Sequence, residues 1–149
     1  MPDACVVDTS CLIVLDKVGL LTLLCAVYKN IYIPGGVISE FGEKPLLNCM
    51  EIIKVNSPLM GILTEELNLG RGEAETITYA YEQGIRAVID DAKARKVAEK
   101  LSIQLTGTLG ILVKAEQKGL IESSYQVAVE LKKVGFRISD KIIEKMKNN

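Results

Sequence analysis

The chain has 149 residues and a nearly balanced charge, with 18 basic and 19 acidic side chains and no histidine. A chain of this length fits one domain with a sizeable core, so we expect a single domain over residues 1–149. The missing histidine excludes the Ser-His-Asp and Cys-His nucleophile systems and the HExxH zinc helix. The net charge of −1 does not by itself indicate a nucleic-acid partner.

Membrane attachment and secretion are not expected. No apolar run reaches the roughly 18 residues that a membrane span requires, and no signal peptide is visible at the N-terminus. Cys5, Cys11, Cys25 and Cys49 lie in apolar surroundings and show no CxxC spacing. We therefore expect buried free thiols, in preference to disulfides or a metal site, and a cytoplasmic protein.

Short apolar runs of strand type alternate with helical patterns along the chain. Strands are expected at residues 4–8, 31–33, 52–55, 87–90 and 103–105. Helices are expected from Thr9 or Ser10 to the stop at Gly19, and at residues 20–28, 37–41, 59–67, 73–83, 92–101, 109–118, 123–133 and 139–147. This alternation is typical of a three-layer α/β sandwich with a parallel sheet of about five strands, flanked by helices and joined by right-handed crossovers.

Two of the expected helices are unusually apolar. Residues 20–28 are apolar nearly all round, so this helix should be well buried. Together with residues 59–67 it offers more hydrophobic surface than a small sheet is expected to cover. We therefore expect a homodimer that buries part of this surface.

Acidic side chains stand where the chain leaves its expected strands. Asp8 closes the first strand, and Asp90 and Asp91 close the fourth. Glu40 lies on the helix after the second strand, and Glu73 opens the helix at residues 73–83. Because the carboxyl ends of parallel strands share one edge, these acids should meet in one crevice. Clustered carboxylates repel unless a cation neutralises them or they bind protons, and such oxygen-rich clusters suit Mg²⁺ or Mn²⁺.

Each of these acids also has an ordinary structural explanation. Asp8 could simply cap the helix that follows it, and Glu40 could be a solvated surface acid. Of Asp90 and Asp91, one is expected to cap the next helix and the other to face the site. The joint placement of the acids is what favours a functional cluster.

Two glutamates compete for the position at the start of the helix at residues 73–83, where the helix dipole favours acids in any protein. Helical spacing places Glu73 on the same stripe as Ile77 and Ala80. Glu75 is turned about 200° away from that stripe and aligns with Tyr79. Glu73 is therefore the expected inward carboxylate.

Three further features carry weaker signals. The loop Gly70-Arg71-Gly72 lacks the lysine of a P-loop, so nucleotide binding is not expected. Residues 107–110 could approach a phosphate with backbone amides and the Thr108 hydroxyl, although a plain tight turn explains them equally well. The basic residues Lys93, Arg95, Lys96 and Lys100 form one helix face, which is either solvated surface or a contact for a phosphodiester backbone.

The motifs of the chain resemble those of the PIN domain family, in particular its small stand-alone prokaryotic branch related to VapC-type toxins. The resemblance covers nearly the whole chain. It rests on VVDTS at residues 6–10, IP at 33–34, VISE at 37–40, GEAE at 72–75, IDD at 89–91 with AR at 94–95, TGTLG at 106–110 and GFRIS at 135–139.

This resemblance implies a three-layer PIN-like fold that includes the C-terminal helices from about residue 123. It also implies a ribonuclease whose acidic quartet binds Mg²⁺ or Mn²⁺, with a homodimeric assembly. The first acid falls on Asp8, the second on Glu40, the third on Glu73 and the fourth on Asp90 or Asp91. Toxins commonly carry Asp at the third position, so Glu73 departs from their pattern.

The hypothesis that follows is an endoribonuclease in which Mg²⁺ or Mn²⁺ held by these acids activates a water. Thr9 or Ser10 could orient that water or the scissile phosphate. Such a protein would act on RNA and could be the toxin of a toxin–antitoxin pair with a small antitoxin partner. The alternative is a PIN-fold module that binds RNA or a protein without cleaving. A phosphohydrolase with Asp8 as covalent nucleophile is disfavoured, because position 10 is Ser and not the Asp of a DxD pair.

Overall fold

The computed structural model describes residues 4–42 and 46–148, so residues 1–3, 43–45 and 149 of the expected domain lie outside the described part. Within these ranges, five short strands form one parallel sheet in the order β3-β2-β1-β4-β5. The strands are β1 (Ala4–Val7), β2 (Asn30–Pro34), β3 (Met50–Ile53), β4 (Arg86–Val88) and β5 (Leu105–Thr106).

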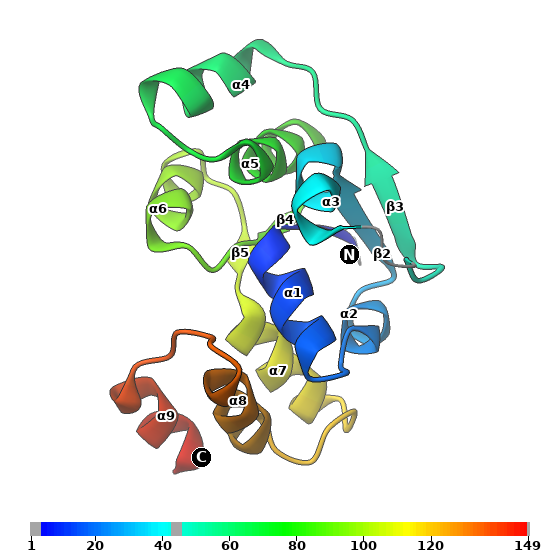
Figure 1. The fold of residues 1–149 in the computed structure, drawn as a ribbon, viewed down its shortest axis with the longest axis vertical. Coiled ribbons are helices and arrows are strands. Elements are labelled where there is room, and N and C mark those ends of the chain that lie inside the picture. The colour runs from blue at the N-terminus through cyan, green and yellow to red at the C-terminus, as the bar shows by residue number, and fades with distance from the viewer. Residues whose placement is uncertain (1–3, 43–45, 149) are drawn as a thin grey trace.

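Helices connect the strands and continue the chain after the last of them (Figure 1). They are α1 (Thr9–Lys17), α2 (Thr22–Val27), α3 (Gly35–Phe41), α4 (Pro58–Gly61), the π-helical segment η1 (Ile62–Glu66), α5 (Arg71–Gln83), α6 (Ala92–Lys100), α7 (Thr108–Gln117), α8 (Ser124–Lys133) and α9 (Asp140–Lys147). The predicted three-layer α/β sandwich with a parallel sheet is confirmed.

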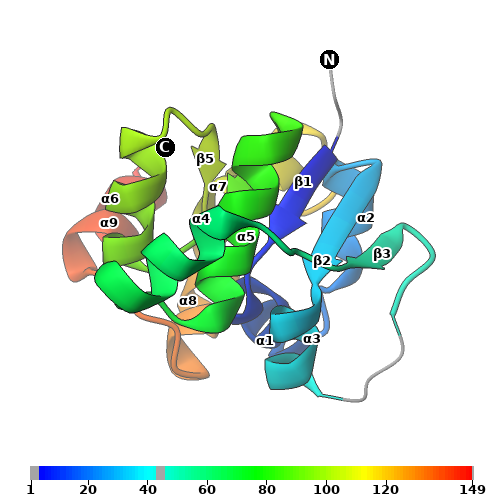
Figure 2. The same cartoon turned by 90° about the horizontal axis from the view of Figure 1, so that it is seen from above.

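The two faces of the sheet carry separate hydrophobic layers. Successive side chains of a strand point to opposite faces, so in β1 Val6 packs on one side and Cys5 and Val7 on the other. Helices α5 and α6 and the η1 segment cover the Val6 side, while α1, α2, α7 and α8 cover the opposite side (Figure 2). Because β1 is buried on both faces, its sequence is a continuous apolar run.

The ends of β1 and β4 lie side by side at the centre of the sheet. Val7 pairs with Val88, and the amide of Asp8 donates to the Val88 carbonyl across 3.1 Å. The chain moves from β1 to β2 on one side and later returns to place β4 on the other side. The carboxyl ends of the paired strands β1 and β4 therefore mark a topological switch point of the sheet, the place where open parallel sheets bind their ligands.

Some predicted boundaries differ from the observed ones. The third strand is Met50–Ile53, two residues earlier than expected, and the fifth is Leu105–Thr106, which begins two residues later and ends one residue later than expected. Both are edge strands that pair with one neighbour, so burial marks them less clearly than it marks β1. Ile52 in β3 is 51% exposed, which shows why its apolar character was a poor guide to the strand limits.

The expected surplus of apolar surface on residues 20–28 is wrong. The large side chains of α2 and its flanks are buried or half-buried against the sheet, including Leu23, Leu24 and Val27. Exposed apolar side chains do occur at Ile62 and Leu67, in and after η1. The homodimer stays a prediction, and these exposed side chains lie within residues 59–67, one of the two segments expected at its interface. No helix in the described part of the chain is long and apolar enough to span a membrane.

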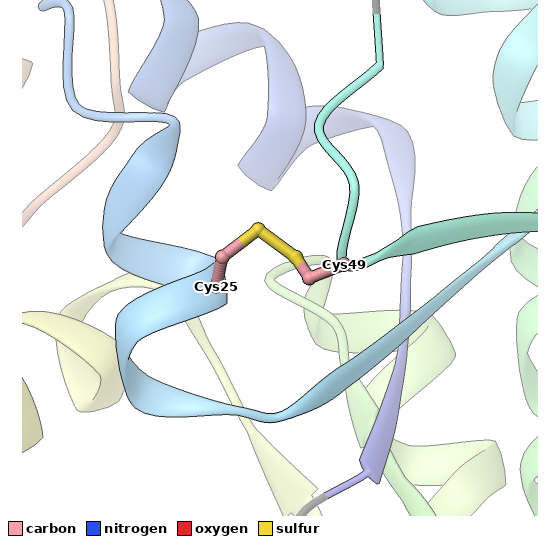
Figure 3. Close-up of a disulfide and its surroundings, with 2 residues drawn as sticks. All are labelled: Cys25 and Cys49. Atoms are coloured by element: carbon pink, nitrogen blue, oxygen red, sulfur yellow. A yellow bond between two sulfur atoms is a disulfide. The ribbon is translucent and has the colours of Figure 1, made fainter.

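Two of the four cysteines are paired, which corrects the expectation of four free thiols. Cys25 in α2 and Cys49 just before β3 form a disulfide, with their Cα atoms 5.7 Å apart (Figure 3). The pairing of β2 with β3 brings the two cysteines together. Ile31 lies in β2, the strand that follows α2, and its amide donates a hydrogen bond to the carbonyl of Cys49. Sequence spacing could not reveal it, because the two cysteines lie 24 residues apart. The disulfide also removes the support that four free thiols would give to a cytoplasmic location.

Cys5 and Cys11 are free, fully buried thiols, as expected. Burial raises the pKa of Cys5 to about 12 and also raises the pKa of Cys11. Both thiols therefore stay protonated at neutral pH and serve as small apolar side chains in the core.

Reduction of the Cys25–Cys49 disulfide is expected to lower the free energy of unfolding. The bond closes a loop of 24 residues, for which the chain-entropy model gives about 3 kcal/mol of stabilisation. Urea denaturation with and without a reductant measures this difference. The double variant Cys25→Ser, Cys49→Ser is the control: its stability should equal that of the reduced protein and should not respond to reductant.

Candidate active site

All five predicted site acids line one pocket at the carboxyl edge of the sheet. The pocket has a volume of about 1040 Å³ and lies over the switch point between β1 and β4. Its acids are Asp8, Glu40, Glu73, Asp90 and Asp91. They come from the ends of two strands and from two helices that are distant in sequence. The structure thus brings the five acids together, and their role as metal ligands stays a prediction.

Asp8 is the most buried of these acids, with 6% of its surface exposed. Its Oδ1 accepts a hydrogen bond from the Thr9 amide at 2.7 Å, so it also caps α1. Burial raises the pKa of Asp8 from 3.8 to about 7, and the charges of Glu73, Glu40 and Asp90 add to this effect. Without a counterion, the Asp8 carboxyl therefore keeps its proton to a much higher pH than an exposed aspartate does.

Glu40 and Asp8 approach each other over Gly72, the second residue of α5. A Cβ placed on Gly72 would lie 2.7 Å from Oε1 of Glu40 and 3.5 Å from Oδ1 of Asp8. The two carboxylates therefore reach one point from different elements, α3 and the end of β1. Any side chain at position 72 would push the Glu40 carboxylate away, which explains the glycine in the GEAE motif.

Glu73 lines the pocket and Glu75 does not, in agreement with the helical spacing. Oε1 of Glu73 accepts a hydrogen bond from the Gly70 amide at 3.2 Å, so this acid also caps α5. Partial burial, followed by the charges of Asp91 and Glu40, raises the pKa of Glu73. Glu75, which the spacing turned away from the site, is nevertheless buried, with 4% of its surface exposed. The sequence pattern did not predict that burial.

One acid of the pair caps the next helix, as expected, although both Asp90 and Asp91 line the pocket. Asp91 is the N-cap of α6, because its Oδ2 accepts a hydrogen bond from the Ala94 amide at 2.9 Å. Asp90 instead reaches across to Thr108 at the start of α7, accepting from the amide at 2.8 Å and from the hydroxyl at 2.6 Å. The Ser10 hydroxyl donates to Asp90 at 3.4 Å and so connects α1 to the end of β4.

These bonds limit one alternative from the sequence, phosphate binding by residues 107–110. Because both the amide and the hydroxyl of Thr108 donate to Asp90, neither is available to hold a phosphate. Thr108 therefore orients Asp90, whereas a phosphate contact through the amides of residues 109 and 110 stays a prediction. Gly107 permits the close approach, since a Cβ there would lie 2.7 Å from Oδ1 of Asp90.

Cations also line the pocket, although fewer of them than acids. Among the described residues they are Arg95 on α6 and Arg137 in the segment between α8 and α9. The guanidinium of Arg95 donates to the carbonyl of Ile89 at 2.8 Å. Lys93 and Lys96, which the sequence placed on the same basic face, do not line the pocket. Arg137 was recognised only as part of the GFRIS motif, because no local pattern shows that the C-terminal helices border the site.

The donor set suits a hard divalent cation, but it is not arranged as a finished metal site. The available donors are carboxylate and hydroxyl oxygens, which Mg²⁺ and Mn²⁺ prefer. The hydroxyl of Thr9, next to Asp8, is buried and has no hydrogen-bond partner in the described part of the chain. Over the same residues, no three acidic or cysteine side chains are gathered closely enough to hold an ion.

The fold and the pocket define an α/β protein with an acidic crevice at the switch point of its sheet. The family model DUF3368, described as a PIN domain, matches residues 4–149. The chain therefore belongs to the PIN domain family, whose members are generally nucleases that use divalent metals. No curated protein and no solved structure gives a significant match.

Proposed function

We propose that this protein is a metal-dependent endoribonuclease that hydrolyses phosphodiester bonds in RNA. One observation carries the proposal: five acids, which follow the ends of β1 and β4 or lie on α3 and α5, line a single pocket at the switch point of a PIN-domain sheet. Burial, with a smaller contribution from the neighbouring carboxylates, raises the pKa of Asp8 and of Glu73, so a nearby cation would favour their ionised forms. Clusters of this kind are a property of functional sites more often than of plain surfaces.

The charge of the pocket explains why a metal would be needed for an RNA substrate. Five acids and two arginines line it, so a phosphodiester backbone would be repelled if the acids were all ionised. A divalent cation held by Asp8, Glu40, Glu73 and Asp90 would neutralise the acids, activate a water and stabilise the leaving oxygen. Asp91 lines the pocket as well, although its Oδ2 is engaged at the start of α6.

The protein's own residues would perform the remaining tasks. Ser10 and Thr108 hold Asp90 in place through their hydroxyls, at 3.4 and 2.6 Å. The unpartnered Thr9 hydroxyl is suited to orient a water or a phosphate oxygen beside Asp8. Arg95 and Arg137 provide positive charge for the RNA backbone at the pocket wall.

Cleavage of a labelled single-stranded RNA by the purified protein tests the proposal. Cleavage should require Mg²⁺ or Mn²⁺ and should stop when EDTA removes the metal. Activity that persists in EDTA would contradict a metal-dependent reaction.

A second function, RNA or protein binding without cleavage, is favoured by a specific observation. Asp90, Asp91 and Glu73 all accept backbone hydrogen bonds at helix starts, so each already has a structural role. RNA binding without cleavage at any metal concentration would support this function. A role as the toxin of a toxin–antitoxin pair is a further part of the proposal, and it predicts a gene for a small antitoxin beside the gene for this chain.

Arg137 allows a test of the proposed contact between the pocket and the RNA backbone. Its side chain is exposed at the pocket and forms no hydrogen bond or ion pair with any described residue, so it is available to a phosphate. Arg137→Gln should weaken RNA binding and reduce the log–log salt slope by about 0.7, the value for one phosphate contact on a single strand. Fluorescence anisotropy over a salt series measures both quantities.

The matched control for Arg137 is Lys141→Gln. Lys141 is an exposed cation at the start of α9 that does not line the pocket. The two substitutions remove the same charge from nearby positions of the chain, so a general charge effect would change both variants equally. Equal slopes for Arg137→Gln and Lys141→Gln would show that Arg137 makes no specific phosphate contact.

A further inference from the structure

Glu75 is a buried carboxylate that the proposed reaction does not use. It lies on α5, outside the acidic pocket, and only 4% of its surface is exposed. A buried carboxylate is costly unless hydrogen bonds or charges compensate it. The contacts of Glu75 therefore indicate what it does in the fold.

The carboxylate of Glu75 joins two helices that are far apart in sequence. Its Oε1 accepts a hydrogen bond of 2.6 Å from the amide of Gly36, the second residue of α3. Its Oε2 lies 3.4 Å from Nε of Arg71 one turn earlier on α5. Because the side chain of Arg71 is 67% exposed, this ion pair contributes little to stability. The hydrogen bond from the Gly36 amide on α3 is therefore the main interaction of the Glu75 carboxylate.

Among residues 4–42 and 46–148, no other side chain is seen to cap the start of α3. Pro34 is its N-cap and provides no side-chain hydrogen bond, although the first amides of a helix lack intrahelical partners. Glu75 fills this role from the neighbouring helix. Position 36 must be glycine for this contact, because a Cβ there would collide with Oε1 of Glu75 and lie 3.1 Å from Cγ of Arg71.

The hydrogen bond from the Gly36 amide to the Glu75 carboxylate, called the clamp below, holds in place the face of α3 that carries Glu40. Residues four apart on a helix lie on the same face, so Gly36 and Glu40 both face α5. On α5, Gly72 lies one turn before Glu75 and contacts the Glu40 carboxylate, with 2.7 Å between Oε1 of Glu40 and a Cβ at position 72. The distance between α3 and α5 therefore sets how far Glu40 reaches into the pocket.

We propose that Glu75 is a positioning residue, whose carboxylate clamps the start of α3 against α5 and thereby holds Glu40 at the acidic pocket. This inference rests on the proposed function in one respect, namely that Glu40 contributes to metal binding. The clamp itself is a separate property that can be measured without metal.

Two substitutions of Glu75 separate the clamp from its charge. Glu75→Gln keeps an oxygen that can accept from the Gly36 amide, whereas Glu75→Ala leaves that buried amide unpaired. In metal-free protein, hydrogen exchange at the Gly36 amide should stay slow in Glu75→Gln and become fast in Glu75→Ala. An amide that remains equally protected in Glu75→Ala would overturn the clamp.

The consequence for the site is measured by Mn²⁺ titration calorimetry. Loss of the clamp in Glu75→Ala should weaken Mn²⁺ binding by about 10–100-fold, the range found when a partner behind a metal ligand is removed. Glu75→Gln should restore most of the affinity. Glu82→Ala, which removes an exposed glutamate from the same helix, is the control and should bind as the wild type does.

A double-mutant cycle distinguishes positioning of Glu40 from a general loss of structure. In a Glu40→Gln background, Glu75→Ala should cause no further loss of Mn²⁺ affinity, because the ligand that it positions is already gone. Additive losses would overturn the proposal. If wild-type protein bound no Mn²⁺, the proposed function and the link to Glu40 would both fail, while exchange at Gly36 would still decide whether the clamp exists.

Discussion

Replacement of Asp8 by asparagine is expected to abolish RNA cleavage and to leave the fold intact. Asparagine keeps the side-chain volume and an oxygen that can accept the 2.7 Å hydrogen bond from the Thr9 amide. It removes the negative charge at the most buried of the five acids. If Asp8 binds the metal directly, the loss in kcat should exceed the roughly 10–100-fold that removal of an outer partner costs. Cleavage of single-stranded RNA in Mg²⁺ measures it, with circular dichroism as the test of folding.

Glu82→Gln is the matched control for this experiment. Glu82 is an exposed acid on α5 that does not line the pocket, so its neutralisation should leave cleavage unchanged. If Asp8→Asn cleaved RNA as fast as the wild type did, the activity would come from a contaminating nuclease and the proposed assignment would be wrong.

The position of the acids could be predicted because it follows from topology. Asp8 and Asp90 come directly after buried apolar strands, and parallel strands place such residues at one edge. The division between Asp90 and Asp91 could also be expected, since a strand-end pair before a helix leaves one acid for the cap. These inferences need only the order of strands and helices, which a clear apolar pattern reveals.

Other features depend on contacts between distant segments and left no local pattern. The Cys25–Cys49 disulfide follows from the pairing of β2 with β3. The burial of Glu75 follows from the packing of α3 on α5, although helical spacing turned it away from the site. Arg137 reaches the pocket because the segment between α8 and α9 borders the sheet edge. In each case, tertiary packing decides the role of a residue whose immediate neighbours are uninformative.

The stability of the metal-free protein is expected to fall as the pH rises from about 4 to about 7. Over this range the unfolded chain loses the proton of Asp8 near its ordinary pKa of 3.8, whereas the folded protein keeps it up to a pKa of about 7. The folded state thus binds more protons than the unfolded state, and a rising pH favours unfolding. At 1.36 kcal/mol per pKa unit, the free energy of unfolding falls by about 4 kcal/mol over this range. The raised pKa of Glu73 acts in the same direction.

Urea denaturation at several pH values, in EDTA, measures this effect. Asp8→Asn should flatten the decline and be more stable than the wild type at pH values above about 7. Glu99→Gln, an exposed acid on α6, should retain the wild-type profile. The lowered pKa of Asp140, caused by its contact with Lys132, acts below that group's ordinary value of 3.8 and so lies outside this range.

The last step of this experiment is the addition of a divalent metal ion. If the acids bind Mg²⁺ or Mn²⁺, adding the ion above about pH 7 should restore the stability of the wild type, because a ligand that binds only the folded state stabilises it. The same ion should have little effect on Asp8→Asn. A wild-type free energy of unfolding that does not change between pH 4 and 7 would show that the pKa of Asp8 is not raised in the folded protein. An equal response of both proteins to metal would place the binding site elsewhere.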